Sequence, residues 1–576
     1  MLYDGKPVSL TPEQEEIATF YAQQLASQHV KKAQFNTNFW KEFKAVLGKS
    51  HVIKDFRKCD FTPIHQHLMQ AREEKKNWTK EQKDADKKEK AELQERYGWA
   101  LVDGYKQKIG NFRVEPPGLF LGRGEHPKTG CVKKRIMPED VTINIGKEAK
   151  VPVCPIPGHN WKAVVHDNTV TWLAFWKENI NDQPKYVWLS ASSHIKGQSD
   201  FRKFETARRL GTIIDRIRET CQKELKSSDM AKKQRATALW LIDKLALRVG
   251  NEKGADEADT VGCCSLRVEH IKLEKPATVH FDFLGKDSMR FERSVEVEAQ
   301  VFANLQKFVQ GKSPKEDLFD QLTTTALNNH LKQQMPKLTA KVFRTYNASY
   351  TLQTQLDKMT DDLDTVEQKG LYYNRCNKDV AILCNHQRSL PKTFSEQMGK
   401  LDQQIAEKEA QKKELQDHLT YLKTGKKPAA KKNKAKEEEE PAKKKQKKGE
   451  KDKEEAGEKE KEKKEKTTEL PDDPAKVKSK IAKLDESIKK LQIKKTEKED
   501  LKTVALGTSK INYLDPRITA AWCKKWGVPI TKIFSKTLRE KFPWALDVSA
   551  EWSFNSPPED SGNNNDDDDD DDNDEE

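Results

Sequence analysis

The stretch Ser509-Lys510-Ile511-Asn512-Tyr513-Leu514-Asp515-Pro516-Arg517 decides how the chain is organised. It follows a long lysine-rich segment and opens a short one that is again rich in aromatic side chains. A piece of about fifty residues buries too little surface to fold alone, so we expect it to dock onto a larger body. Tyr513 would then be a side chain delivered to a distant part of the chain. From this stretch alone, a tyrosine that merely caps a core is the simpler interpretation.

Composition points to a large, polar protein with a polyanionic partner. Apolar and charged residues each make up 35% of the 576 residues, which is typical of chains with long solvated segments. The net charge is +13 although ten of the last eleven residues are acidic, so the rest of the chain is more basic still. Nucleic acid is the expected partner, although charge alone does not separate DNA from RNA or from an acidic membrane.

Several classes of function find no support in the sequence. The nine cysteines are scattered without zinc-ligand spacing, which is typical of reduced thiols in a cytosolic or nuclear protein. No apolar run approaches the ~20 residues that cross a bilayer. No phosphate-binding loop of the GxxxxGK[ST] type is present, and no paired carboxylates lie in an apolar strand. We therefore expect no membrane association, no metal and no cofactor.

Residues 115–130 predict a loop, because proline and glycine recur there. Gly122 and Gly124 flank Arg123, so the backbone can approach a partner closely and the guanidinium can reach a groove or a phosphate. An ordinary surface loop is an equally good interpretation. Residues 139–193 then predict several β-strands.

Four further stretches each carry one polar side chain for which a structural explanation would suffice. The stretches are ALRVGNEK (246–253), FDFLGKDS (281–288), LTAKVFRTYNAS (338–349) and AILCNHQR (381–388). The side chains in question, one from each stretch in this order, are Arg248, Lys286, Arg344 and His386. We expect Lys286 at the exposed tip of a hairpin that turns at Gly285.

Together with Tyr513, these side chains form the set that phosphodiester transfer to a protein hydroxyl needs. Charge gathers on the non-bridging oxygens of the attacked phosphate, where guanidinium groups and a donating histidine stabilise it. The departing oxygen needs a proton, which a lysine can give. A phenol, with a pKa of ~10, is both a nucleophile and a fair leaving group, so the new bond can be reversed.

The five stretches, in this order, resemble those of the eukaryotic type IB DNA topoisomerases. The resemblance implies that Arg248 and Arg344 bind the scissile phosphate and that His386 hydrogen-bonds a non-bridging oxygen. It implies that Lys286 is the general acid and that Tyr513 is the nucleophile of a 3′-phosphotyrosyl link. The implied activity is relaxation of supercoiled double-stranded DNA by single-strand cutting and controlled rotation, without ATP.

The same resemblance implies DNA contacts near the cleaved bond, a monomer and a nuclear location. The DNA-binding candidates are Arg123, His126, Lys196, Asp287, Lys341 and Asn512. Members of that family usually carry a further charged N-terminal region before the segment with which this chain opens.

Composition and resemblance together predict a multidomain α+β protein. The expected domains are a mixed α/β cap half that clamps DNA (1–193), a mostly helical catalytic core resembling tyrosine recombinases (194–389), an antiparallel coiled-coil linker (390–506), a small helical C-terminal domain with the tyrosine (507–555) and a disordered acidic tail (556–576). The tail has two candidate roles, namely competition with DNA for the basic surface and binding of histones or other basic proteins.

The linker prediction depends on two apolar seams at helical spacing, residues 398–422 and 477–491. Between them lies a Lys/Glu-rich insert, about 425–470, that we expect to be disordered. Its lysines are candidates for a nuclear import signal and for a brake on DNA rotation. A merely solvated coiled coil is an equally good interpretation.

Two other functions fit parts of the pattern. Tyrosine recombinases share an Arg, Lys, His and Tyr set, and Lys341 with Arg344 fits their spacing too. The cap half, the linker and the form of the tyrosine stretch favour the topoisomerase. The second alternative is a non-enzymatic chromatin protein held on DNA by charge, whose salt dependence would be equally strong.

Overall fold

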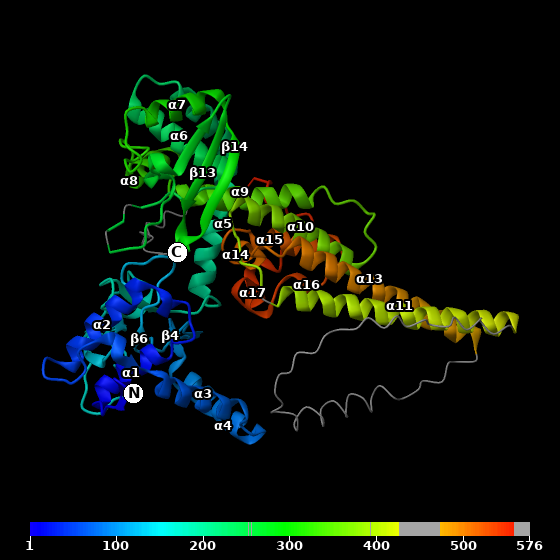
Figure 1. The fold of residues 1–576 in the computed structure, drawn as a ribbon. Helices are drawn as coiled ribbons and strands as arrows, with labels where there is room; N and C mark the ends of the chain where they lie inside the picture. The colour runs from blue at the N-terminus through cyan, green and yellow to red at the C-terminus, as the bar shows by residue number, and fades with distance from the viewer. Residues whose placement is uncertain (252, 255, 392, 426–472, 558–576) are drawn as a thin grey trace. The chain divides into compact units, whose positions relative to one another are not determined.

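The structure is a computed structural model that describes residues 1–251, 253–254, 256–391, 393–425 and 473–557. The chain forms two compact units (Figure 1). Unit 1 comprises 1–359, 379–387 and the described residues from 506 onward, and unit 2 comprises 360–378 and the described part of 388–505. The predicted Lys/Glu-rich insert beyond Gly425 and the acidic tail beyond Pro557 lie outside the described residues. Helices and strands both contribute, as the predicted mixed fold class requires.

The first part of unit 1 combines helices with short strands. Its helices are α1 (Pro12–Ala22), α2 (Ala33–Leu47), α3 (Thr62–Lys76) and α4 (Lys80–Tyr97). Its strands are β1 (Leu2–Tyr3), β2 (Lys6–Pro7), β3 (Cys59–Asp60), β4 (Trp99–Val102), β5 (Tyr105–Lys108), β6 (Gly118–Leu119), β7 (Val132–Lys133), β8 (Thr142–Asn144), β9 (Ala163–Val165), β10 (Trp172–Lys177) and β11 (Pro184–Trp188).

An aromatic core holds α1 against α2. Phe35, Phe39 and Phe43 are fully buried and recur every four residues, so they form one face of α2. The ring of Tyr21, on α1, stacks on Phe39 with the ring centroids 4.4 Å apart. Truncation of one such ring, as in Phe39→Ala, typically costs ~3–5 kcal/mol, so this cluster contributes to the stability of this part of the chain.

The strands predicted between residues 139 and 193 form a four-stranded sheet in the order β11-β10-β8-β9. Strands β10 and β11 pair in antiparallel fashion, whereas β8 and β9 are parallel neighbours. The strand prediction is therefore confirmed. The pairing of β8 with β9 across an intervening loop is a long-range feature that alternation does not encode.

The second part of unit 1 is mostly helical and carries one antiparallel sheet. Its elements are α5 (His194–Leu225), α6 (Met230–Leu245), β12 (Ile271–Glu274), β13 (Thr278–Leu284), β14 (Arg290–Glu296), α7 (Ala299–Val309), α8 (Thr324–Gln334) and α9 (Ala340–Leu356). Helices α5, α6 and α9 pack against one another, and β13 and β14 form the predicted hairpin (Figure 1). In α6, Leu241 and Ile242 are fully buried, because the helix is apolar along the face that meets α5 and α9.

The end of the chain docks back onto this helical part, as its small size predicts. Its helices are α14 (Leu506–Asn512), α15 (Pro516–Lys525), α16 (Ile530–Ile533) and α17 (Lys536–Lys541). Helix α15 packs against α9, and the Trp544 ring lies edge-on to Phe201 of α5 with centroids 5.3 Å apart. This docking places the tyrosine segment inside unit 1.

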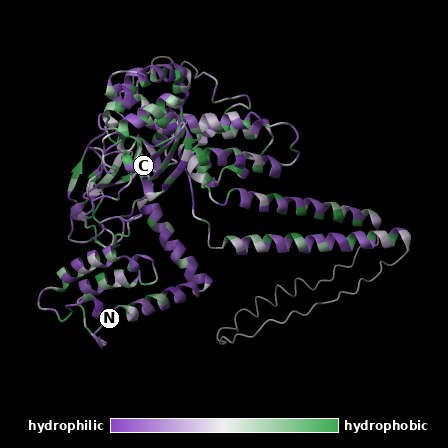
Figure 2. Ribbon diagram, turned by 45° about the horizontal axis from the view of Figure 1, so that its top comes forward, coloured by the Kyte–Doolittle hydropathy of each residue, from purple (hydrophilic) through white to green (hydrophobic). Residues whose placement is uncertain are grey.

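Unit 2 contains two long helices, α11 (Phe394–Thr424) and α13 (Pro474–Asp500), which pack side by side. Ion pairs of 2.6 Å join Lys412 to Asp485 and Lys495 to Asp402, so residues later in α11 face residues earlier in α13. The two helices therefore run in opposite directions. Figure 2 colours both of them mainly as hydrophilic, with apolar positions recurring along them. No helix in the described part of the chain is both long and apolar enough to span a membrane.

Candidate active site

Tyr513 lies between two short helices and is 4% exposed. Its amide donates to the carbonyl of Ser509 (2.9 Å), which ends α14. Asp515 then caps α15 by accepting the amide of Arg517 (3.0 Å). The hydroxyl of Ser349, on α9, donates to the carbonyl of Tyr513 at 2.9 Å and accepts the amide of Asp515 at 3.0 Å. The backbone around the tyrosine is therefore held by the helix that also carries Arg344.

A buried ion-pair cluster anchors the same segment. Arg517 is 5% exposed and binds Asp515 (2.7 Å) and Glu205 of α5 (2.6 Å). Burial alone would lower the pKa of Arg517, but its bonds to the two carboxylates raise it above its usual range. Arg208 pairs with Glu205 (3.0 Å) and donates to the carbonyl of Ser556 (2.9 Å). The cluster ties both the segment that follows Tyr513 and the last described residues of the chain to α5.

Arg344 joins three segments of the site. It is 7% exposed and donates hydrogen bonds to the carbonyls of Ala246 and Cys384, which lie shortly before Arg248 and His386. Its Cζ stands 4.9 Å from the centroid of the Tyr513 ring. Its buried Nε makes no hydrogen bond within the described chain. An unpaired buried N–H of a guanidinium is costly, so this donor fits an anionic oxygen.

Arg248 reaches the tyrosine from a sharp bend after α6. The helix ends at Leu245, and Ala246 adopts the left-handed conformation with φ 50°. Gly250, with φ 80°, lies so close to Gly262 that a Cβ there would sit 2.5 Å from its backbone. These two backbone features turn the chain so that Arg248 Cζ lies 5.9 Å from the Tyr513 ring centroid.

His386 completes the cluster around the ring. It follows α10 (Val366–Leu383), and its amide donates to the carbonyl of Ala381 at 2.8 Å. Its ring stacks on Tyr513 with centroids 5.3 Å apart and planes 29° apart. Its Nε2 lies 3.3 Å from Arg344 Nη2, and its Nδ1 lies 2.7 Å from Ser509 Oγ. Two arginines, a histidine and a tyrosine are thus assembled from four distant stretches.

Lys286 comes from the β13–β14 hairpin, which hydrogen-bonds both to the segment that follows Arg248 and to the end of α10. The carbonyl of Leu284 accepts the amide of Val261 (2.8 Å), and Arg293 donates to the carbonyl of Ile382 (2.6 Å). Lys286 lies in the turn between β13 and β14, as predicted, but it is half-buried rather than exposed.

The predicted turn residue is also wrong. Gly285 has φ −93°, whereas Asp287 and Ser288 adopt the left-handed conformation with φ 65° and 57°. The turn is closed by the amide of Gly285, which donates to the carbonyl of Met289 at 2.8 Å. Aspartate tolerates the left-handed region better than most residues, so the turn does not need its glycine there.

Three family models match the chain. The eukaryotic DNA topoisomerase I catalytic core matches residues 192–419, the eukaryotic DNA topoisomerase I DNA binding fragment matches 1–189, and the C-terminal topoisomerase domain matches 485–554. Human DNA topoisomerase 1 is 48% identical over 557 residues, which are 95% of this chain and 68% of the human protein. The chain belongs to the eukaryotic DNA topoisomerase I family.

Two further relatives are similarly close. DNA topoisomerase 1 beta of Arabidopsis thaliana is 50% identical over 557 residues, and DNA topoisomerase 1 of Caenorhabditis elegans is 50% identical over 562. These alignments cover 96% and 95% of this chain but 57% and 64% of the two relatives. The chain therefore spans somewhat more than half the length of these relatives.

Arg123 of this topoisomerase-family chain lies in the predicted loop, between Gly122 (φ 64°) and Gly124 (φ 60°). Its guanidinium pairs with Asp287 at the hairpin tip, and a Cβ on Gly124 would collide with Ser288. The loop therefore touches the hairpin that carries Lys286, which brings two DNA-binding candidates together.

His126 is the candidate whose surroundings fit a DNA contact least. It is 9% exposed, its ring lies edge-on to Phe120 at 4.8 Å, and its Nδ1 accepts the amide of Lys128 at 3.1 Å. Burial first, and then the charge of Lys128, lower its pKa. These contacts describe a side chain that supports the loop, so its DNA contact stays a prediction.

The other three candidates lie on helices of the helical part. Lys196 is half-buried in the first turn of α5, and Lys341 is exposed in the first turn of α9, one helical turn before Arg344. Asn512 precedes the tyrosine directly, and its carbonyl accepts a hydrogen bond from Lys203 Nζ at 3.1 Å. Their roles on DNA remain predictions.

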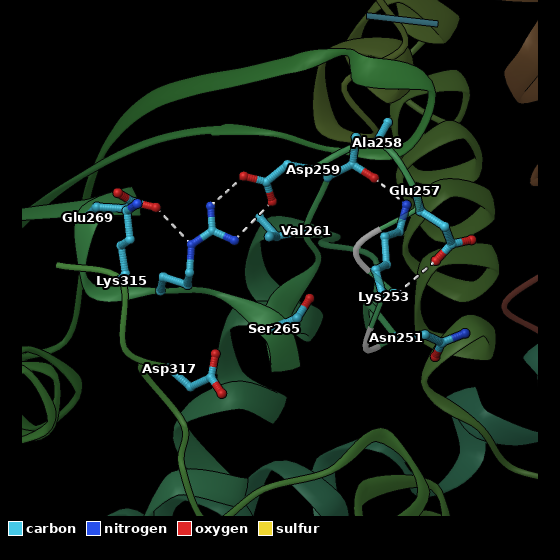
Figure 3. A pocket seen from close by; sticks show the side chains of 13 residues that line it. Asn251, Lys253, Glu257, Ala258, Asp259, Val261, Ser265, Glu269, Lys315 and Asp317 are labelled. Carbon is cyan, nitrogen blue, oxygen red and sulfur yellow. Dashed lines mark hydrogen bonds and ion pairs between the residues drawn. The ribbon is translucent and has the colours of Figure 1, made fainter. Parts of the chain in front are cut away.

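A cavity of about 620 Å³ lies beside the segment that follows Arg248, and none of the five candidate residues lines it (Figure 3). Among its charged groups, Arg267 binds Asp259 at 2.8 Å and Glu269 at 2.7 Å. Among the described residues, no group of three or more His, Cys, Asp or Glu side chains is arranged to hold a metal ion. The cluster around Tyr513 is thus a different place from this cavity.

Sequence reasoning missed Ser349 and Ser509, which hold Tyr513 and His386 in place. Both are fully buried. Their positions in the sequence could have identified them, because Ser349 ends the LTAKVFRTYNAS stretch and Ser509 opens the tyrosine stretch. A polar side chain inside a strongly patterned stretch needs a partner when it is buried, and that partner lies elsewhere in the chain.

Proposed function

We propose that the protein relaxes supercoiled double-stranded DNA by transient cleavage of one strand, with Tyr513 as the nucleophile. One observation carries the proposal: Arg344 and Arg248 stand 4.9 Å and 5.9 Å from the Tyr513 ring centroid while His386 stacks on the same ring. Membership of the eukaryotic DNA topoisomerase I family supports it.

Cleavage proceeds by attack of the Tyr513 oxygen on the phosphorus, and the phenolic proton passes to solvent water. The P–O5′ bond breaks, a bond between phosphorus and the tyrosine oxygen forms, and the DNA is held as a 3′-phosphotyrosyl ester. Arg248, Arg344 and His386 stabilise the charge that develops on the non-bridging oxygens, and the unpaired Nε of Arg344 supplies one donor. Lys286 gives its proton to the departing 5′-oxygen.

Religation is the reverse of the same step. A phenol has a pKa of ~10 and leaves phosphorus more readily than an aliphatic alcohol, so the freed 5′-hydroxyl can displace it. The ester conserves the energy of the broken bond. The reaction therefore needs neither ATP nor a metal ion.

The flanking parts of the chain hold the duplex. Arg123, His126, Lys196, Asp287, Lys341 and Asn512 are the proposed contacts. Residues 1–193 act as a cap over the DNA, and residues 194–389 act as a catalytic core that resembles tyrosine recombinases. Residues 507–555 form the tyrosine domain.

Helices α11 and α13 act as an antiparallel coiled-coil linker that slows rotation of the cut duplex. The cross-pairs Lys412–Asp485 and Lys495–Asp402 support this assignment, because they fix the register of the two helices. The protein acts as a monomer in the nucleus. The acidic tail (556–576) is proposed to contact basic partners, with histones as the first candidates.

Plasmid relaxation in EDTA without ATP tests the proposal. The wild-type protein should remove supercoils under these conditions, and Tyr513→Phe should bind DNA but relax nothing. Tyr350→Phe is the matched control, because Tyr350 is an exposed tyrosine on α9. Relaxation by Tyr513→Phe, or a strict need for a divalent ion, would refute the mechanism. Strand exchange between two duplexes would instead favour a recombinase.

A further inference from the structure

Ser509 and His386 form a buried hydrogen-bonded pair between distant parts of the chain. The hydroxyl oxygen of Ser509 lies 2.7 Å from His386 Nδ1. The serine is fully buried and the histidine is 7% exposed. Ser509 lies on α14, four residues before the tyrosine, whereas His386 follows α10. A single short helix therefore brings both a nucleophile and a partner for the histidine.

We propose that Ser509 is a positioning residue that accepts the Nδ1–H of His386 and thereby fixes the orientation of its ring. Docking of α14 then positions Tyr513 and, in the same event, supplies the hydrogen-bond partner of His386. The inference rests on the role proposed above for His386 as a donor to the phosphate.

The tautomer matters because a neutral imidazole carries its proton on one nitrogen only, and the bond made by the other nitrogen decides which one. Arg344 Nη2 lies 3.3 Å from Nε2, and a guanidinium only donates, so Nε2 accepts this hydrogen bond and the proton of neutral His386 resides on Nδ1. Nδ1–H then donates to the hydroxyl oxygen of Ser509. When Nε2 takes up a proton and donates to a non-bridging oxygen, the bond from Nδ1–H to the serine keeps the ring in place.

The same turn of helix fixes the distance between the two functional groups. The carbonyl of Ser509 accepts the amides of Tyr513 and Leu514, both at 2.9 Å. Movement of the tyrosine segment therefore moves the serine with it. A neutral hydroxyl also orients the ring without adding a negative charge beside Arg344, so the arginine keeps its full attraction for a phosphate.

Single-turnover cleavage of a short DNA duplex tests the proposal. Ser509→Ala should cleave about tenfold more slowly, with DNA affinity within about twofold of wild type, since one buried hydrogen bond is lost. In a His386→Gln background, Ser509→Ala should cause no further slowing, because the serine acts through the histidine. Ser349→Ala is the matched control: this buried serine holds the Tyr513 backbone and should slow cleavage equally in both backgrounds.

Two results would overturn the proposal. The first is a wild-type cleavage rate for Ser509→Ala, and the second is the same slowing with and without His386. The tautomer is read separately by ¹⁵N NMR of histidine-labelled, DNA-free protein, with His386→Gln assigning the signal. We expect the Nδ1–H tautomer in the wild type, with an Nδ1 signal that shifts in Ser509→Ala because the acceptor of its hydrogen bond is lost. This NMR measurement does not depend on cleavage. It therefore distinguishes an error in the proposed Ser509–His386 hydrogen bond from an error in the proposed function.

Discussion

The hydroxyl of Ser349 donates a hydrogen bond of 2.9 Å to the carbonyl of Tyr513. The same oxygen accepts the amide of Asp515 at 3.0 Å, so one side chain holds the backbone on both sides of Leu514. Helix α9 supplies this serine and, five residues earlier, Arg344. The helix that carries a phosphate-binding candidate therefore also determines where the tyrosine lies.

Ser349→Ala should destabilise the docked tyrosine segment. The change leaves a buried carbonyl and a buried amide without a partner, which costs roughly 1–3 kcal/mol. Thermal unfolding should show a lower Tm, and limited proteolysis should cut earlier between 506 and 516. Ser228→Ala, at an exposed serine, is the control and should leave both unchanged. Equal Tm values for the two variants would contradict this account of the site.

Arg517→Met should be more damaging than any loss of an exposed arginine. Asp515 is fully buried and loses its ion-pair partner when the guanidinium is removed, whereas half-buried Glu205 keeps its ion pair with Arg208. Such a loss typically costs ~3–5 kcal/mol. Denaturant unfolding measures the loss, with Arg57→Met as the control, because the ion pair of Arg57 with Asp55 is exposed and contributes little to stability. Similar losses in both variants would show that the cluster is not an anchor.

Arg344→Lys should abolish most activity although it keeps the charge. A lysine has no planar fork, so it cannot bond the carbonyls of Ala246 and Cys384 and still present a donor to the phosphate. We expect cleavage to fall by at least about a hundredfold. Arg290→Lys, at an exposed arginine of β14, is the matched control and should retain cleavage. Wild-type cleavage by Arg344→Lys would mean that the fork has no part in the reaction.

His270 makes folding sensitive to mild acid. Burial first, and then the charge of Arg267, lower its pKa below the ordinary 6.5. The unfolded chain therefore takes up the proton first, so the stability from neutral His270 is fully present above pH 6.5 and is lost as the pH falls below it. His270→Asn should remove this dependence. The difference in unfolding free energy between wild type and variant should shrink from about pH 7.5 to about pH 5.5, and a constant difference would contradict the assignment.

Features that depend on local pattern could be predicted from the sequence. The β13–β14 hairpin follows from two apolar runs around a short polar turn, and the helical position of Arg344 follows from the apolar spacing around it. The turn itself was harder, because Asp287 and Ser288 rather than Gly285 adopt positive φ. The backbone hydrogen bond between Gly285 and Met289 closes the turn in this conformation, and the amino-acid composition does not predict that bond.

Long-range pairings could not be predicted in the same way. Ser349 meets the tyrosine segment, and Ser509 meets His386, across more than a hundred residues of intervening chain. Periodicity describes which face of an element is buried, not which distant element covers it. The convergence of the site residues was proposed from chemistry and resemblance, whereas the supporting serines needed the fold.

The covalent link itself is the most direct measurement. The wild-type protein is mixed with a nicked or short duplex, denatured rapidly and digested with nuclease and protease, and the peptides are examined by mass spectrometry. The account predicts a nucleotide joined through its 3′-phosphate to Tyr513 in the peptide that contains residues 511–517, and no adduct in Tyr513→Phe. An adduct on another side chain, or one that persists in Tyr513→Phe, would contradict the central claim.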